Sequence, residues 1–236
     1  MQEINYIGNE LELFQHASVW KNYYGKLIRP YLKGNVLEVG AGIGSTTSSL
    51  CDGSQKEWLC VEPDPLLFDK LEQKVIAGEL PACCKAIKGT TSDLPVKSRF
   101  DAIMYIDVIE HIENDAAELE QAYKLLADGG HLIVLVPAHQ YLYNEFDKAI
   151  GHYRRYNKAM LKKAAPLALG LEKIRYLDSC GLFASLSNKY FLKQQYPTIK
   201  QIKFWNNVIV PVSKLTDIIF NYSLGKTVVA IWKKQS

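Results

Sequence analysis

Short apolar runs alternate with segments of helical periodicity along most of the chain, and glycine or proline residues separate them. Residues 9–32 repeat apolar side chains at near-helical spacing, and Pro30 and the pair Gly34-Asn35 close this segment. Apolar runs that predict strands follow at residues 36–39, 58–62, 83–87, 100–106 and 131–136, with helices between them. Strands that alternate with helices predict a parallel sheet with right-handed crossovers.

The last third of the chain completes this sheet. Two further strands are predicted near residues 172–177 and 226–232, and the residues between them mix aromatic and small apolar side chains in two amphipathic helices. We therefore expect an α/β fold with a seven-stranded, mostly parallel sheet, an antiparallel last hairpin and helices on both faces. Its expected parts are a helical N-terminal cap (1–33), a core (34–178), a helical insertion or lid (179–225) and the final strand of the core (226–236).

Composition narrows the class of protein. Hydrophobic residues make up 48% and charged residues 22% of the 236 residues, which is typical of a globular protein. The net charge of +3, from 28 basic and 25 acidic residues, is too balanced to predict a nucleic-acid stripe. The five cysteines form no CxxC pair, which favours reduced thiols. No window holds the roughly 20 apolar residues of a membrane span, and the first residues lack a secretory pattern, so we expect a cytoplasmic protein.

A glycine-rich turn follows the first predicted strand. Gly40, Gly42 and Gly44 stand where the backbone must turn tightly and can approach a ligand. Glu62 ends the second predicted strand, where a carboxylate can accept both hydroxyls of a ribose. In a parallel sheet, both sites meet at the edge formed by the carboxyl ends of the strands. Together they predict a nucleotide-like ligand, whereas the glycine turn alone would also fit dinucleotide enzymes.

The sequence around this turn resembles motif I of the class I methyltransferases, with the acidic Glu38 inside the strand. The resemblance continues through three later motifs in the family's order and spacing. The four motifs lie at residues 36–44, 61–64, 100–112 and 125–130. The resemblance implies a bacterial methyltransferase of the small-molecule type, with a Rossmann-like core at 34–178 that binds S-adenosylmethionine and releases S-adenosylhomocysteine.

The resemblance also implies which residues bind the cofactor. The glycine turn and Glu38 would surround the methionine part, and Glu62, followed by Pro63, would hold the ribose. The backbone of Ile106, Asp107 and Val108 would meet the methionine amine, and the adenine would lie near Thr90, Thr91 and Ser92. Thr90 stands where many relatives carry an aspartate, which puts that adenine contact in doubt. No metal is expected, because methyl transfer is an in-line displacement at the sulfonium carbon.

Residues for the acceptor side come from the loops after the fourth and fifth strands. His111 and His139 are the candidate bases, with Tyr143 as a third, and His111 could instead only shape the pocket. The run His152, Tyr153, Arg154, Arg155 and Tyr156 concentrates cations and aromatic rings that could bind a carboxylate, phosphate or diphosphate. A structural alternative makes the arginines a clamp that bonds loop carbonyls and Asp147. The helices of 179–225 could pack on the sheet, cover an apolar acceptor or lie on a membrane surface.

The predicted function is methyl transfer from S-adenosylmethionine to a small-molecule acceptor, for which an anionic or diphosphate-bearing group is one option. The first alternative is an NAD(P)-dependent oxidoreductase, against which Glu38 and the turn Asp128-Gly129-Gly130 argue. The second is an RNA-binding or RNA-methylating module, for which one basic cluster is too little. Nucleic acid is therefore not the expected partner, and the chain would act as a monomer or homodimer.

Overall fold

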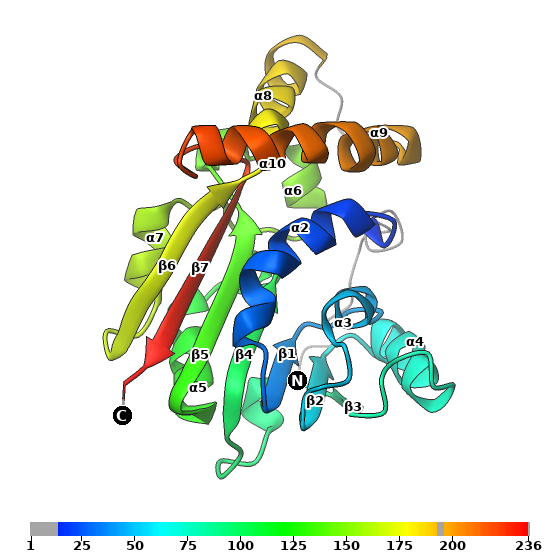
Figure 1. Cartoon of the computed structure of the whole chain (residues 1–236), viewed down its shortest axis with the longest axis vertical. Helices are drawn as coiled ribbons and strands as arrows, with labels where there is room; N and C mark the ends of the chain where they lie inside the picture. The colour runs from blue at the N-terminus through cyan, green and yellow to red at the C-terminus, as the bar shows by residue number, and fades with distance from the viewer. Residues whose placement is uncertain (1–13, 193–195, 236) are drawn as a thin grey trace.

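The computed structural model describes residues 14–192 and 196–235, built around one seven-stranded sheet (Figure 1). The strand order is β3-β2-β1-β4-β5-β7-β6, and β7 runs antiparallel to both of its neighbours while the other pairs are parallel. The strands are β1 Asn35–Val39, β2 Glu57–Glu62, β3 Cys84–Lys88, β4 Phe100–Ile106, β5 Leu126–Pro137, β6 Leu169–Leu177 and β7 Thr227–Lys234. The expected sheet is confirmed, and its order reverses between β1 and β4, where ligands bind in open parallel sheets.

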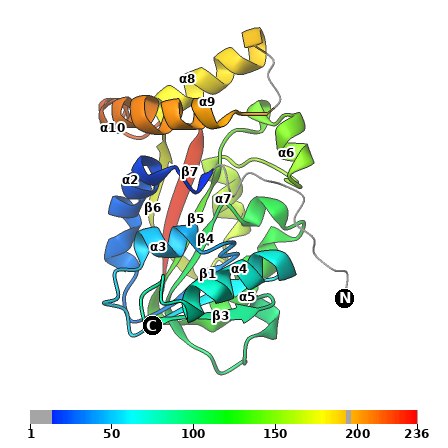
Figure 2. The same ribbon diagram turned by 90° about the vertical axis from the view of Figure 1, so that its right-hand side faces the viewer.

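Alternate residues of each strand face opposite sides of the sheet, and helices bury both sides (Figures 1 and 2). Val36 lies in the core cluster beneath α2, α3 and α4, whereas its neighbour Leu37 lies in the cluster beneath α5 and α7. The helices are α2 Ser18–Ile28, α3 Ser45–Leu50, α4 Pro65–Ile76, α5 Asp115–Leu125, α6 Glu145–Ala149, α7 Lys158–Ala164, α8 Ser179–Ser187, α9 Ile199–Phe204 and α10 Val210–Ile219. No helix in the described ranges has both the length and the apolar character needed to cross a membrane.

The carboxyl end of the sheet is covered by α8, α9 and α10, which lie together at the top of Figure 1. Two fully buried carboxylates fix this arrangement. Asp178, which caps α8, accepts hydrogen bonds from Trp205 Nε1 at 2.7 Å and Ser213 Oγ at 2.6 Å. Asp217 on α10 accepts from the backbone N–H of Asp178 at 2.7 Å and of Ser179 at 2.8 Å. The three helices are therefore held to the end of β6 by polar contacts at their base.

Several elements differ from the sequence prediction. The single helix predicted over residues 9–32 is interrupted, because Phe14 is helical, residues 15–17 are not, and α2 begins at Ser18; residues 9–13 of the prediction lie outside the described residues. Strand β5 begins at Leu126, so the turn predicted at residues 128–130 lies inside it, at a register shift against β4. The predicted pair of helices in 179–225 forms α8, α9 and α10, with π-helical turns at Asn188–Leu192 and Trp205–Ile209. Helices α6 and α7 were not predicted, because five and seven residues are too few to show helical periodicity.

Candidate active site

The glycine turn after β1 has the backbone that its sequence predicts. Gly40, Gly42 and Gly44 all have positive φ angles, of 66°, 56° and 74°. A Cβ atom added to Gly40 would lie 2.7 Å from Cγ2 of Val108, which belongs to the loop after β4. The N–H group of Gly40 donates to the carbonyl of Val61 at 2.8 Å. The turn thus brings the ends of β1, β2 and β4 together closely enough that a side chain at Gly40 would separate them.

Glu62 is buried at the end of β2 and is bonded to the glycine turn. Its Oε2 accepts from the N–H of Gly42 at 2.7 Å, and its Oε1 accepts from the N–H of Asp64 at 3.0 Å. Burial raises the pKa of Glu62, and these two N–H groups oppose the rise. A carboxylate oxygen can accept two hydrogen bonds, so each oxygen keeps capacity for a hydroxyl. The residue therefore fits the expected ribose ligand.

Glu38 lies under α3 and is bonded to protein groups. Its Oε2 accepts from Thr47 Oγ1 and Trp58 Nε1, both at 2.8 Å, and the side chain is only 3% exposed. Burial raises its pKa to about 7 against these two hydrogen bonds. Lys21 on α2 donates to Ser45 Oγ at 2.8 Å, and burial lowers its pKa to about 8, opposed by the charge of Glu38. The structure thus places Glu38 where β1, β2 and α3 meet, and its contact with a cofactor stays a prediction.

Asp107 stands just after the carboxyl end of β4, where the strand order of the sheet reverses. Its φ angle is 55°, and its N–H donates to the carbonyl of Leu135 at 2.8 Å. The residue is exposed, yet desolvation raises its pKa to about 7, while the charges of Lys226 and Lys21 oppose the rise. The flanking Ile106 and Val108 are half-buried. A carboxylate at this end of the sheet suits the ammonium group of a bound amino acid.

The stretch expected near the adenine uses its hydroxyl groups internally. Thr90 Oγ1 donates to Asp93 Oδ2 at 2.9 Å in a capping box. The fully buried Thr91 donates to Glu118 Oε1 at 3.0 Å. Ser92 is exposed. An adenine contact in this stretch would therefore come from Ser92 or from backbone atoms more readily than from the two threonine hydroxyls.

The run from His152 to Tyr156 does not form a single surface. Arg154 donates to the carbonyl of Glu113 at 2.7 Å and pairs with Asp115 at 2.9 Å. The buried Tyr156 donates to the same carboxylate at 2.6 Å, and Tyr153 is 53% exposed. Arg154 and Tyr156 therefore attach this segment to the start of α5. For Arg154, these are the bonds to loop carbonyls that the structural alternative expected.

A buried group of ionisable side chains surrounds the other half of the run. Asp147 Oδ1 accepts from Arg155 Nε and contacts His152 Nδ1, each at 2.9 Å. Glu110 Oε1 lies 3.9 Å from His152 Nε2, and neither carboxyl oxygen of Glu110 has a hydrogen-bond partner in the described chain. Burial raises the pKa of Glu110 well above its usual range. The His111 ring lies 4.5 Å from that of His152, and burial lowers its pKa to about 4, so His111 is neutral at pH 7.

His139 follows β5 directly, in a backbone conformation with φ of 69°. Its ring stacks between those of Tyr141 and Tyr176, at centroid distances of 5.0 and 4.8 Å. Its Nε2 lies 2.9 Å from the carbonyl oxygen of Gly225, and burial lowers its pKa. The third candidate base, Tyr143, donates its hydroxyl proton to the carbonyl of His152 at 2.6 Å.

Lys226 adds a cation that the sequence did not reveal. Its Nζ lies 3.5 Å from Asp178 Oδ2 and 4.0 Å from the centre of a Trp205 ring. Burial lowers its pKa, the charge of Asp178 raises it, and the nearby charge of Arg155 lowers it further. No local pattern marks this lysine, because its partners come from the start of α8 and from the π-helical turn at Trp205–Ile209. Its charge lowers the pKa of Asp107.

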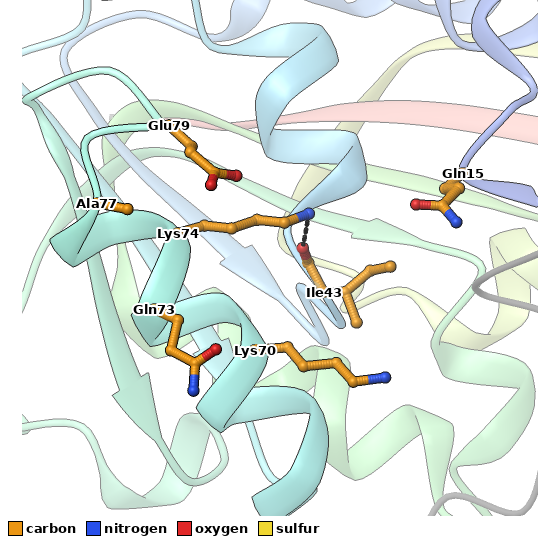
Figure 3. A pocket seen from close by; sticks show the side chains of 7 residues that line it. All are labelled: Gln15, Ile43, Lys70, Gln73, Lys74, Ala77 and Glu79. Atoms are coloured by element: carbon orange, nitrogen blue, oxygen red, sulfur yellow. Dashed lines mark hydrogen bonds between the residues drawn. The ribbon is translucent and has the colours of Figure 1, made fainter.

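A hollow of about 490 Å³ lies on the outer side of the glycine turn (Figure 3). Its lining comes mainly from α4, and Lys74 reaches across it to donate to the carbonyl of Ile43 at 2.8 Å. Glu62, Asp107 and Lys226 do not line it. The hollow is therefore separate from these three side chains, and Lys74 braces the turn from behind.

Residues 37–132 match a family model described as a methyltransferase domain. This part of the chain is therefore a methyltransferase domain, and the fold around it is the α/β fold of the class I methyltransferases. S-adenosylmethionine is the cofactor of this family, which confirms the cofactor expected from the sequence. The match gives no support to the nicotinamide alternative. No curated protein matches the chain in sequence.

Solved structures with similar folds share little sequence with this chain. A protein from Bacillus halodurans described as a methyltransferase is 18% identical with a TM-score of 0.59, over 89% of this chain and 98% of its own. Coclaurine N-methyltransferase, bound to N-methylheliamine and S-adenosylhomocysteine, is 12% identical with a TM-score of 0.63, over 92% and 72%. The [4+2]-cyclase SpnF is 11% identical with a TM-score of 0.61, over 90% and 80%. Since a cyclase shares the fold, the reaction must be argued from the site.

Proposed function

We propose that this protein transfers the methyl group of S-adenosylmethionine to a small-molecule acceptor that carries an anionic group. The observation that supports the acceptor class is the cation of Lys226 at the carboxyl end of the sheet, where its Nζ lies 3.5 Å from Asp178 Oδ2 and the charge of Arg155 is near enough to act on it. This is the end where parallel sheets bind their ligands. The cofactor thus follows from the family, and the acceptor class is inferred from the local charges.

The cofactor side of the site would use the carboxylates of Glu62 and Asp107. Glu62 has capacity for the ribose hydroxyls, and Asp107 offers a negative charge after β4 for the cationic end of the cofactor. The glycine turn leaves room for close backbone approach between them. When bound, S-adenosylmethionine supplies an electrophilic methyl group, and these residues would hold it in one orientation.

The acceptor side would use desolvated cations. The Nε of Arg155 donates a hydrogen bond to Asp147, while its two terminal nitrogens have no hydrogen-bond partner in the described chain. Its guanidinium can therefore still bind a carboxylate or phosphate through two parallel hydrogen bonds. Lys226 would add a second positive charge, and Trp205 beside it offers an apolar wall. An acceptor with an acidic group and an apolar body would match these three side chains.

Methyl transfer to a hydroxyl would also need a group that takes the acceptor's proton as the new bond forms. We favour His139 for this role, because it directly follows Ala138, whose N–H donates to the carbonyl of Lys226 at 2.7 Å. Its lowered pKa keeps the ring neutral at pH 7. If Nε2 donates to Gly225, Nδ1 carries the lone pair that accepts the proton. His111, which is also neutral, is the second candidate.

A labelled-methyl assay over anionic metabolites, prenyl diphosphates, sugars and phenols, read by mass spectrometry, tests the proposal. We expect methylation only of acceptors with an acidic group. Lys226→Met should raise KM for the acceptor at least tenfold and leave that for S-adenosylmethionine unchanged, whereas Lys85→Met, far from the site, should change neither. Efficient methylation of neutral acceptors that survives Lys226→Met would contradict the proposed acceptor class.

The base is tested separately with the acceptor so identified. His139→Asn should lower kcat at unchanged KM and should remove the acidic limb of the pH profile of kcat. If His111→Asn shows this behaviour instead, the proton acceptor is His111.

A further inference from the structure

The exposed large apolar side chains gather on one part of the molecule, the cap segment, which we define as the described residues 179–192 and 196–220. Eleven of the nineteen that the described residues expose lie in this segment, which is less than a fifth of the chain. Single exposed apolar residues are ordinary on protein surfaces, but a continuous group marks a contact with something else. The cap segment is therefore the part of the surface that is best suited to contact a partner.

The group follows one face of a long helix. Helix α9, the π-helical turn at Trp205–Ile209 and α10 form an uninterrupted helical run that crosses the top of Figure 1. Phe204, Val208, Val212, Leu215 and Ile219 recur every three or four residues along it, which places them on one side. Their exposed fractions range from 47% to 75%.

The opposite side of the same helical run is buried against the protein. Ile202, Trp205 and Val210 are at most 9% exposed. The helical run is thus apolar on both sides, although only one side has a partner in the described chain. A helix that is apolar all round is normally buried on every side.

The charges that accompany this apolar face are all positive. Within the described residues of the cap segment, the charged side chains are Lys189, Lys200, Lys203, Lys214 and Asp217. Asp217 is fully buried, so every outward charge is a lysine. The whole chain has 25 acidic residues against 28 basic ones, so the absence of outward acids here is a local feature.

We propose that the cap segment docks on the surface of a membrane that contains anionic lipids. An apolar stripe bordered by lysines is complementary to acyl chains beneath acidic headgroups, and such helices lie in the plane of the membrane without spanning it. A second copy that presented the same face would bring lysines against lysines with no outward carboxylate to pair them. The charge pattern therefore favours the lipid surface over a symmetric dimer.

Docking would also place the proposed acceptor site next to the headgroups. Trp205 on the buried side of the helical run contacts Lys226, so the membrane and the anion site would lie on opposite sides of one helix. If the proposed function holds, this arrangement suits an acceptor that is itself an anionic amphiphile. The proposed docking surface does not depend on the identity of the acceptor.

Co-sedimentation of the full chain with vesicles tests the docking surface without cofactor or acceptor, so its failure is separate from a failure of methyl transfer. We expect binding to phosphatidylcholine vesicles that contain phosphatidylglycerol, weak binding to phosphatidylcholine alone, and release by high salt. Leu215→Glu with Ile219→Glu should weaken binding more than tenfold. The matched control, Leu66→Glu with Ile76→Glu, changes two exposed residues of α4 and should have no effect.

A second pair of variants tests the docking surface even if the Leu215→Glu, Ile219→Glu variant fails to fold. Lys200→Gln and Lys203→Gln change exposed side chains only, and each should weaken binding about fivefold, since a lysine near an anionic surface contributes about 1 kcal/mol. Binding that is absent, or equal for the wild type and the Leu215→Glu, Ile219→Glu variant, would overturn the proposal. So would a wild-type dimer that this variant converts to monomers while neither binds vesicles, because the occupant would then be a second copy.

A different observation, at the other end of the sheet, supports a second inference. Cys51, at the end of α3, meets Cys83 and Cys84 at the start of β3, with its Sγ 3.5 and 3.6 Å from theirs. Sulfur ligands of one zinc ion at about 2.3 Å stand about 3.8 Å apart in a tetrahedron, so the three thiols are spaced close to what the metal needs. Gln55 Oε1 lies 3.3 Å from Cys51 Sγ and could supply an oxygen ligand.

The geometry points to a structural site here for a soft divalent ion of the zinc type, with three thiolates and an oxygen ligand. It would connect the end of α3 to the start of the edge strand β3, at the amino end of the sheet. Binding of one ion would release the protons of those thiols that are still protonated.

Cobalt substitution of the reduced full chain tests this site. We expect one Co²⁺ per chain with the intense near-ultraviolet band of thiolate ligation, and its loss in Cys51→Ser. Cys180→Ser, which removes a thiol from α8, is the control. A spectrum with no thiolate band, or one that survives Cys51→Ser, would overturn the assignment, as would a Cys51–Cys83 disulfide in protein purified with reductant.

Discussion

The buried carboxyl of Glu38 makes folding stability depend on pH in a way that one substitution should remove. Burial raises its pKa from an ordinary 4.5 to about 7. Between these values the folded protein keeps a proton that the unfolded chain releases, so stability falls as the pH rises from about 4.5 to about 7. Glu38→Gln imitates the protonated carboxyl, and its carbonyl can still accept from Thr47 and Trp58.

The size of this effect follows from the shift. Each pKa unit corresponds to about 1.4 kcal/mol, so the contribution of Glu38 to the free energy of unfolding should change by about 3 kcal/mol across this range. The glutamine variant should therefore gain up to about 3 kcal/mol relative to the wild type between pH 4.5 and pH 8. The attraction of Lys21 for the charged form is already contained in the shift.

Urea unfolding of both proteins at a series of pH values measures this difference. Other groups also titrate in the range, but they are common to both proteins and cancel when the free energies are subtracted. Glu57→Gln, which removes a half-buried carboxylate paired with Lys85 at the other end of β2, is the control and should show no such drift. A difference for Glu38→Gln that stays constant with pH, or that moves against the variant at high pH, would refute the reasoning.

Three further substitutions test the site. Gly40→Ala should lower the free energy of unfolding by about 1–3 kcal/mol, because its Cβ would lie 2.7 Å from Val108 Cγ2 at a positive φ, and Val108→Ala in the same chain should recover part of the loss in thermal melts. Glu62→Gln should weaken S-adenosylhomocysteine binding about 10- to 100-fold by isothermal titration, since hydrogen bonds to a charged acceptor contribute about 1.5–3 kcal/mol; unchanged affinity would remove Glu62 from the ribose site. Arg154→Ala should lower the melting temperature with little change in acceptor KM, whereas Arg155→Ala should raise that KM, and the reverse pattern would exchange their roles.

Local signals in the sequence were enough to predict the sheet and the conformation of the glycine turn. Strand β4 was predicted with its observed limits, because a short apolar run ends at charged or turn residues on both sides. The positive φ angles of the turn also follow from its glycines. Helix α6 carries a local signal that periodicity misses, the capping box of Asn144 and Asp147.

The acceptor side depends on contacts between distant segments, which no local pattern records. Lys226 meets Asp178 and Trp205 only because the helices after β6 fold back over the sheet. The adjacent residues Arg154 and Arg155 pair with different carboxylates, Asp115 and Asp147, and of these two partners the sequence indicated only Asp147. Likewise, Glu110 looks like an ordinary helix-start acid in sequence, yet it is completely buried.

Titration calorimetry of S-adenosylhomocysteine against the wild type and Gly42→Val, with NAD as a comparison ligand, tests the central claim most directly. The account predicts one site per chain for S-adenosylhomocysteine, no binding of NAD, and complete loss of binding in Gly42→Val with the fold retained. Tight NAD binding without S-adenosylhomocysteine binding, or unchanged affinity in Gly42→Val, would contradict it.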